Sequence, residues 1–321
     1  MGTSRPSVPH ESGRDCATTL GPLVDPVIIL FGLGVGVLIG LTGVGGGSLM
    51  TPLLLIVGGY SPSVAIGTDL AYGAITKTLG GWQHLRAGNV DLRLSRWMAF
   101  GSVPGAILGV VVLELLADAY GDDFQPWLLG AVAGALALAA AATLYRSLFR
   151  PGLTAKERDH ATLQRKVSRV GTVGIGLTLG FILGLTSVGS GALVGLALIL
   201  LYKLRPRRVV GTDVFHAAIV MWAAAIAHMF GGNIDWALMG TILIGSLPGV
   251  WIGTALVPHV PVPALRTTLG AVLAAAALGV TKKAGADIPP VLIVIVPLAI
   301  GAFAVWMHKY HPLHRTQPAK A

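Results

Sequence analysis

Charged residues are scarce in this sequence, and so is cysteine. Only 12% of the residues are Asp, Glu, Lys or Arg, whereas soluble domains have about 25%. With 54% hydrophobic residues, the chain has too few polar side chains to cover a soluble domain, and that class is excluded. Apolar runs such as 127–144 and 291–307 match membrane-spanning helices, which need about 18 residues or more. The sequence therefore predicts an all-α polytopic membrane protein.

The shortage of cysteines and acids also limits the chemistry. Cys16 is the only cysteine, which excludes an internal disulfide and a cysteine-based metal site. The acids within apolar segments are chiefly Asp69 and Asp213, too few for the oxygen cage of a hard metal cation. An intramembrane enzyme would need acids, bases or metal ligands clustered on one face, whereas the histidines are distributed over both. We therefore expect no enzyme activity, no cofactor and no metal site.

The net charge of +9 does not indicate a nucleic-acid partner. The basic residues lie in loops between apolar segments, where they report membrane topology. Residues 1–22 are polar and rich in Pro, Ser and Thr, without the basic and apolar regions of a signal peptide. We expect a disordered tail there.

Glycine, in contrast, is abundant, and many glycines belong to an internal duplication. The chain has 44 glycines in 321 residues, nearly twice the usual share of about 7%. Residues 40–109 recur at 184–253, at an offset of 144 and without insertions, and 24 of the 70 aligned pairs are identical. Two large homologous halves in one apolar chain are typical of secondary transporters. The repeated elements are Gly40–Leu49 and Gly184–Leu193, Gly67-Thr68-Asp69 and Gly211-Thr212-Asp213, His84 and His228, Gly88–Asp91 and Gly232–Asp235, and Gly101–Gly105 and Gly245–Gly249.

Apolar runs predict eleven helical segments, five in each half and one more at the end. Segments 47–58 and 190–202 are short for a crossing of about 20 residues, and we expect each to belong to a broken helix. The predicted segments are 24–42, 47–58, 63–86, 96–117, 126–149, 168–186, 190–202, 208–230, 236–257, 264–281 and 288–307.

Loop charges predict that the two halves are inverted relative to each other. The loop 86–96 is basic, whereas its counterpart 231–235 has no base; the turn 59–62 has no base, whereas 203–208 is basic. The positive-inside rule places the basic loops in the cytoplasm, and five segments per half reverse the orientation. The predicted organisation is a tail (1–22), a first repeat (23–149), a basic cytoplasmic linker (150–167), a second repeat (168–287), an extra helix (288–307) and a cytoplasmic tail (308–321).

The strongest site candidates are two glycine-rich breaks, each between a long apolar segment and a short one. Glycine lets the backbone turn, and a helix that restarts exposes amide groups with partial positive charge. Two such ends facing each other would bind an anion at mid-membrane; the alternative is a tight packing turn. The candidate substrate-binding residues are Thr42, Gly43, Gly45, Gly46, Gly47 and Ser48 in the first break and Thr186, Ser187, Gly189, Ser190 and Gly191 in the second.

Four titratable side chains within the apolar segments are further candidates. Asp69 and Asp213 are candidates for coupling or gating, because a carboxylate at membrane depth is costly; alternatively, each caps its own helix. Lys77, whose mate is Met221, would bind the anion or extend to the interface. His216, three residues after Asp213, would relay protons or pack in the core.

The remaining repeated motifs favour structural roles. In His-x3-Gly-Asn-x-Asp, glycine would close one helix and Asp91 or Asp235 would cap the next. The elements Gly101–Gly105 and Gly245–Gly249 favour close helix packing or a hinge.

Together, the motifs resemble the sulfite exporter TauE/SafE family of membrane transport proteins over about residues 25–281. The glycine-rich breaks, the two Gly-Thr-Asp triplets, His-x3-Gly-Asn-x-Asp and Gly-Ser-x-Pro-Gly carry the resemblance. It implies a bacterial inner-membrane carrier of sulfur-containing oxyanions, such as sulfite or organosulfonates. The segment 288–307 has no partner in the other half and departs from a simple duplication.

These observations predict a carrier that exports a small sulfur-containing anion by alternating access, with protons as a candidate coupling ion. Its partners would be the anionic substrate and the lipid bilayer. The alternatives are a carrier for another small anion or for a metal cation and, less favoured, an intramembrane enzyme.

Overall fold

The structure, a computed structural model, describes residues 26–42, 47–148, 168–204, 206–256 and 262–310, and these form helices and short connections. The predicted tail 1–22 and linker 150–167 lie outside these ranges. The predicted all-α polytopic fold is confirmed. The helices are α1 (Pro26–Thr42), α2 (Gly47–Ile56), α3 (Pro62–Arg86), α4 (Leu92–Tyr120), the 3₁₀ helix η1 (Gly121–Phe124), α5 (Gln125–Leu148), α7 (Arg169–Thr186), α8 (Leu193–Leu200), α9 (Pro206–Phe230), α10 (Trp236–Leu256), α11 (Val262–Lys283) and α12 (Pro290–Tyr310).

Several helices are long and apolar enough to cross a bilayer. Five described stretches meet this condition by length and composition: α4, the first 23 residues of α5, α7, the part of α9 from Arg208, and α10. Large apolar side chains point outward from the bundle, such as Phe230, Trp251 and Trp127, which are 84%, 81% and 78% exposed. A surface this apolar fits lipid rather than water.

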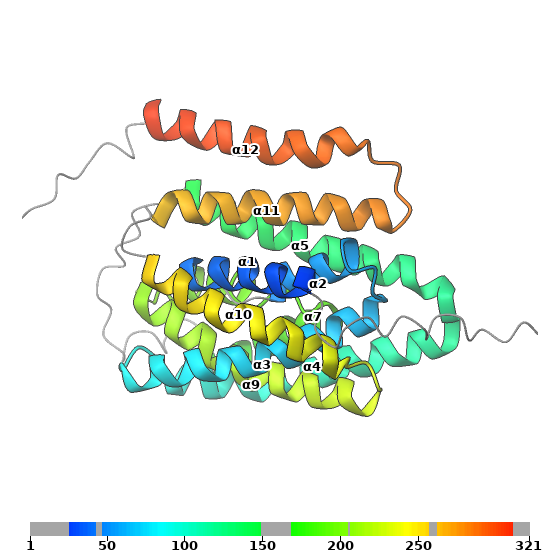
Figure 1. The fold of residues 1–321 in the computed structure, drawn as a ribbon. Helices are drawn as coiled ribbons and strands as arrows, with labels where there is room; N and C mark the ends of the chain where they lie inside the picture. Colours follow the sequence, from blue (N-terminus) through cyan, green and yellow to red (C-terminus); the bar gives the residue numbers. More distant parts are fainter. Residues whose placement is uncertain (1–25, 43–46, 149–167, 205, 257–261, 311–321) are drawn as a thin grey trace, which may run out of the picture.

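The helices lie side by side with their axes roughly aligned, and α12 forms an outer layer against α11 (Figure 1). The main interfaces join the two halves: α4 packs along α7, α1 along α10, α3 along α9, and α5 along α11. Each of the first two interfaces is the counterpart of the other, because α4 corresponds to α10 and α7 corresponds to α1 in the duplication.

Glycine rows allow two of these interfaces to close. A Cβ atom at Gly101, Gly105 or Gly109 of α4 would overlap a carbonyl oxygen of α7. The mates Gly245, Gly249 and Gly253 of α10 meet carbonyl oxygens of α1 in the same way. Lipid tails are as apolar as leucine, so close van der Waals packing, rather than hydrophobic burial, holds such helices together. The Gly-Ser-x-Pro-Gly motif therefore packs helices, as predicted.

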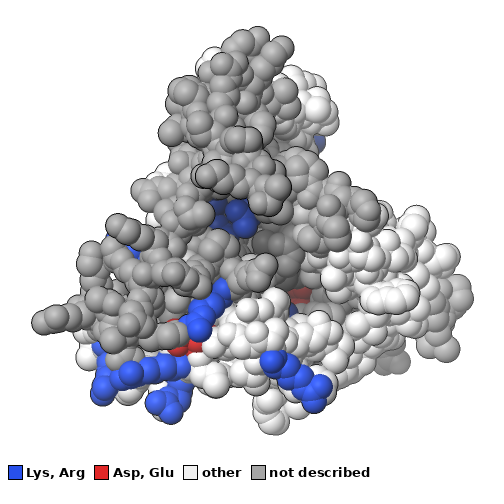
Figure 2. Space-filling view, turned by 90° about the vertical axis from the view of Figure 1, so that its left-hand side faces the viewer, with Lys and Arg blue, Asp and Glu red and all other residues white. Residues whose placement is uncertain are grey.

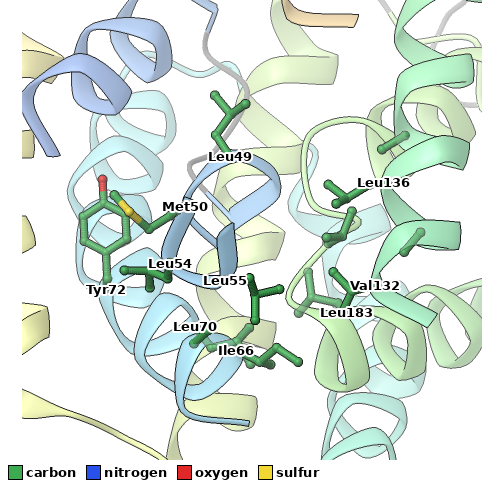
Figure 3. Packing of buried hydrophobic residues seen from close by; sticks show 14 of the residues in the cluster. Leu49, Met50, Leu54, Leu55, Ile66, Leu70, Tyr72, Val132, Leu136 and Leu183 are labelled. Carbon is green, nitrogen blue, oxygen red and sulfur yellow. The ribbon is translucent and has the colours of Figure 1, made fainter. Parts of the chain in front are cut away.

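The short helix α2 is held inside the bundle by apolar contacts. Its side chain Leu55 is fully buried in one cluster with Ile66 of α3 and Leu136 of α5 (Figure 3). This packing anchors the end of α2 against α3 and α5.

Candidate functional site

The second glycine-rich break is a buried turn between α7 and α8. Ser187, Gly189 and Gly191 have φ angles of 57°, 142° and 90°, in the region that favours glycine. The Thr186 hydroxyl donates to the Ile182 carbonyl oxygen at 2.6 Å and accepts from the Val188 amide at 3.2 Å. Thr186 therefore stabilises the turn itself. The hydrogen-bond donors available to the bundle interior belong to the later residues of the break.

The first break lies between Thr42 of α1 and Gly47 of α2. The predicted residues Gly43, Gly45 and Gly46 lie outside the described residues, as does the side chain of Thr42. Ser48, one residue into α2, is 1% exposed, and its hydroxyl has no hydrogen-bond partner in the described chain.

Asp69 connects the two halves of the chain through hydrogen bonds near the second break. Its carboxylate is fully buried, and its Oδ2 accepts hydrogen bonds from Thr51 of α2 and, at 2.9 Å, from Ser187 of the second break. Its Oδ1 has no partner among the described residues. The alternative that Asp69 caps α3 is wrong, because α3 begins at Pro62 and has no acid in its first turn.

Asp213 occupies the matching place beside the second break. It is 4% exposed, and its Oδ1 accepts a hydrogen bond from the Gly191 amide at 3.2 Å. The capping alternative is wrong here too, since α9 begins at Pro206. The Asp213 carboxylate thus accepts from a backbone amide that we had expected to bind the anionic substrate.

Lys77 is buried in α3 between these acids. It is 4% exposed, so it does not extend to the interface, and its Nζ has no hydrogen-bond partner within the described ranges. Asp213 and Asp69 are both close enough to attract it electrostatically, Asp213 more strongly. An ammonium without a hydrogen-bonded partner is costly in an apolar interior, and an anion would relieve that cost.

His216 contacts α4 rather than the acid on its own helix. Its Nε2 lies 2.8 Å from the Ser102 hydroxyl, and its Nδ1 has no partner in the described part of the chain. The repeat mates of these two residues, Tyr72 and Ser246, lie near each other, but their oxygens make no hydrogen bond among the described residues. The matching positions thus carry an imidazole in one half and a phenol in the other.

Each Gly-Thr-Asp triplet places its aspartate through a contact with the other half. Gly67 lies against the Asn233 carbonyl, and the Thr68 hydroxyl accepts from the Asp235 amide at 3.0 Å. The mate Thr212 accepts in the same way from the Asp91 amide at 2.9 Å. These reciprocal contacts fix the rotation of α3 and α9, and hence where Asp69 and Asp213 point.

The structural interpretation of His-x3-Gly-Asn-x-Asp is confirmed. Asp91 accepts from the Leu94 amide at 3.0 Å and Asp235 from the Leu238 amide at 2.9 Å, as helix caps do. Gly88 and Gly232 have positive φ angles of 68° and 70°. No group of three or more His, Cys, Asp and Glu side chains within the described ranges is placed to hold a metal ion.

Arg146 is a site residue that the sequence interpretation missed. Its Nη1 donates to the Gly191 carbonyl oxygen at 3.4 Å and lies near Asp213. A Cβ atom at Gly195 would lie 2.8 Å from Nη1, so glycine leaves room for the guanidinium. The only signal was an arginine at the end of an apolar run, which the positive-inside rule interprets as a topology marker.

The arrangement is suited to binding an anion. The Lys77 amino group and the hydroxyls of Ser48 and Ser190 are buried without a hydrogen-bond partner in the described chain. Buried polar groups in proteins are nearly always hydrogen-bonded, so these three groups are candidates to bind a ligand. An all-α membrane bundle with buried charges at helix breaks defines a membrane transport protein.

The chain belongs to the sulfite exporter TauE/SafE family, which it matches over residues 28–280. The Probable membrane transporter protein YjnA of Bacillus subtilis (strain 168) is 40% identical over 232 residues, covering 72% of this chain and 90% of the relative. The Probable membrane transporter protein YunE of the same organism is 26% identical over 239 residues, covering 71% of this chain and 85% of the relative. A Probable membrane transporter protein of Xylella fastidiosa (strain Temecula1 / ATCC 700964) is 28% identical over 236 residues, covering 73% and 85%. The family and these relatives are transporters rather than enzymes, and no solved structure matches the chain.

Proposed function

We propose that the protein is a secondary transporter that exports a small sulfur-containing oxyanion, sulfite or an organosulfonate, by alternating access. The observation that carries the proposal is a set of three buried polar groups, the Lys77 amino group and the Ser48 and Ser190 hydroxyls, all without hydrogen-bond partners among the described residues. A pyramidal oxyanion offers several acceptor oxygens and would bind all three. We propose the bacterial inner membrane as its location, with the C-terminus in the cytoplasm.

The two short helices give the site its means of opening. α2 and α8 begin beside glycines and pack against helices of both halves. Rigid-body rocking of one half against the other would expose the site first to one side and then to the other. The basic end of the bundle, where α3 ends and α4 begins (Figure 2), would be the cytoplasmic one.

The two aspartates would couple substrate binding to protons. Asp213 holds the Gly191 amide and Asp69 holds the Ser187 hydroxyl, which are donors that an anion would use. Substrate and carboxylate therefore compete for these donors. An aspartate that takes up a proton as a monovalent anion binds would make loading electroneutral, and the substrate and proton gradients together would drive efflux.

Flux in proteoliposomes tests the proposal. The purified protein is reconstituted, and efflux of labelled sulfite and of a labelled organosulfonate is measured, with sulfate and a divalent cation for comparison. We expect saturable efflux of a sulfur oxyanion and none of the cation. Saturable cation flux, or no anion flux under any gradient, would overturn the proposal.

Variants of Lys77 test whether the flux depends on the proposed binding site. Lys77→Met introduces the side chain of the repeat mate Met221 and removes the charge. Charge-assisted hydrogen bonds contribute about 1.5–3 kcal/mol, so apparent affinity should fall about ten- to hundredfold. Lys77→Arg retains the charge and should keep part of the affinity. Ser48→Ala introduces the residue found at the repeat mate Ala192, and it should lower the affinity less than Lys77→Met does.

A further inference from the structure

A pair of basic side chains lies beside the second break, on the side of the basic end of the bundle. Arg146 is in the last turn of α5, and Arg266 is in the second turn of α11. The neighbouring residues tie the two helices together, because the Ser147 and Thr267 hydroxyls are 2.7 Å apart. This hydrogen bond places the two arginines at a similar level of the α5–α11 helix pair.

The two guanidinium groups are close enough to repel each other, and both side chains are partly buried. Asp213 attracts Arg146, which explains the position of that side chain. Nothing comparable explains Arg266, which makes no hydrogen bond or ion pair within the described ranges. Like charges at short range are costly where the dielectric is low.

Around the second break, the described bases are Lys77, Arg146 and Arg266. Asp213 attracts Lys77 and Arg146, whereas no described acid does so for Arg266. Two neighbouring guanidinium groups can be bridged by an oxyanion, because each offers paired N–H donors to two oxygens.

We infer that Arg146 and Arg266 form a second oxyanion-binding site, between the basic end of the bundle and the helix break. Its ligand has at least two oxygens on a sulfur or phosphorus atom, as in sulfite, an organosulfonate or a lipid phosphate. Arg146 and Asp213 contact the same residue of the break: Arg146 donates to the Gly191 carbonyl oxygen, and the Gly191 amide donates to Asp213. Gly191 therefore connects this second site with Asp213. A role for this site in substrate entry rests on the proposed function. Its binding of an oxyanion can be measured without transport.

Equilibrium binding of labelled sulfite to the full chain in phosphatidylcholine nanodiscs tests the inference. The wild type should bind at two sites. Arg266→Gln should weaken one of them about ten- to hundredfold, the range expected when charge-assisted hydrogen bonds are lost, and Lys77→Met should weaken the other. Arg266→Lys retains the charge without the paired donors and should lie between. Arg93→Gln, at an exposed position of the same end, is the matched control and should bind as the wild type does.

Nanodiscs that contain phosphatidylglycerol distinguish the two sources of the ligand. If a lipid phosphate occupies the arginine pair, sulfite binding at this site should weaken several-fold in the anionic nanodiscs, and only where Arg266 is present. If the ligand is the free anion, the lipid should make no difference. Either result supports an oxyanion site.

Equal stoichiometry and affinity in wild type and Arg266→Gln, in both lipids, would overturn the inference. Thermal unfolding guards against misfolding: without sulfite, Arg266→Gln should be at least as stable as the wild type, because repulsion is removed. Failure of the proposed function has a different outcome, since wild-type flux would be absent while sulfite binding at the arginine pair persisted.

Discussion

Asp213 accepts a hydrogen bond from the Gly191 amide, and Asp69 accepts one from Ser187. Both bonds are made to the α7–α8 break, by acids that come from different halves of the chain. At the scale of the residue, the site therefore contains acids of its own. A substrate must displace a carboxylate or bind beside a protonated one.

Replacing Asp213 with asparagine separates these functions. The amide oxygen of Asp213→Asn can still accept from Gly191, but the charge and the proton site are lost. We expect methanesulfonate exchange to continue and the accompanying proton movement to disappear. A pH-sensitive dye inside preloaded vesicles would record alkalinisation during efflux for the wild type and none for the variant. Equal alkalinisation in both would exclude Asp213 as the coupling group.

The backbone at Ser187 supports a second residue-scale prediction. Its φ of 57° costs a side chain about 1–2 kcal/mol relative to glycine. Ser187→Ala and Ser187→Gly both lose the hydrogen bond to Asp69, but only glycine removes the backbone cost. We expect the glycine variant to be more stable than the alanine variant by about 1 kcal/mol, as measured by chemical unfolding in detergent. Equal stability of the two would show that the turn relaxes when the hydroxyl is lost.

At the scale of the element, the helices could be predicted well because membrane helices follow long apolar runs. The predicted segments 63–86 and 236–257 match α3 (Pro62–Arg86) and α10 (Trp236–Leu256) closely. The contacts between helices could not be predicted, since they depend on how helices from opposite halves rotate and slide. Arg146 looked like a loop charge, and nothing in the spacing connects Ser102 with His216.

The role of glycine in the α4–α7 interface can be tested within α7. Gly176 lies against the Met98 carbonyl of α4, whereas a Cβ atom at Gly174 would meet nothing within 4 Å. Gly176→Ala should lower the free energy of unfolding by about 1–3 kcal/mol, the usual cost of overpacking. Gly174→Ala, the matched control, should raise it by up to about 1 kcal/mol through helix propensity. Similar losses at both positions would mean that helix spacing is not set by this glycine row.

At the scale of the whole molecule, each half is completed by the other. Thr68 holds the loop before α10, and Thr212 holds the loop before α4. The helices α4 and α10 pack on α7 and α1 in turn. Because the main interfaces cross between the halves, neither half encloses the site alone, and rearrangement of one interface would be felt at its counterpart.

The inversion that the loop charges predict would place repeat mates on opposite sides of the membrane. Leu92 and Trp236 are mates at the starts of α4 and α10, and they are similarly exposed, at 53% and 56%. In a Cys16→Ser background, which removes the only natural thiol, we would introduce Leu92→Cys or Trp236→Cys. A membrane-impermeant maleimide should label Trp236→Cys in intact cells and Leu92→Cys only after permeabilisation, because the loop before Leu92 is basic and should be cytoplasmic. The Cys16→Ser parent is the unlabelled control. Labelling of both positions from the same side would contradict the inverted topology, and with it a site shared between two opposed helix breaks.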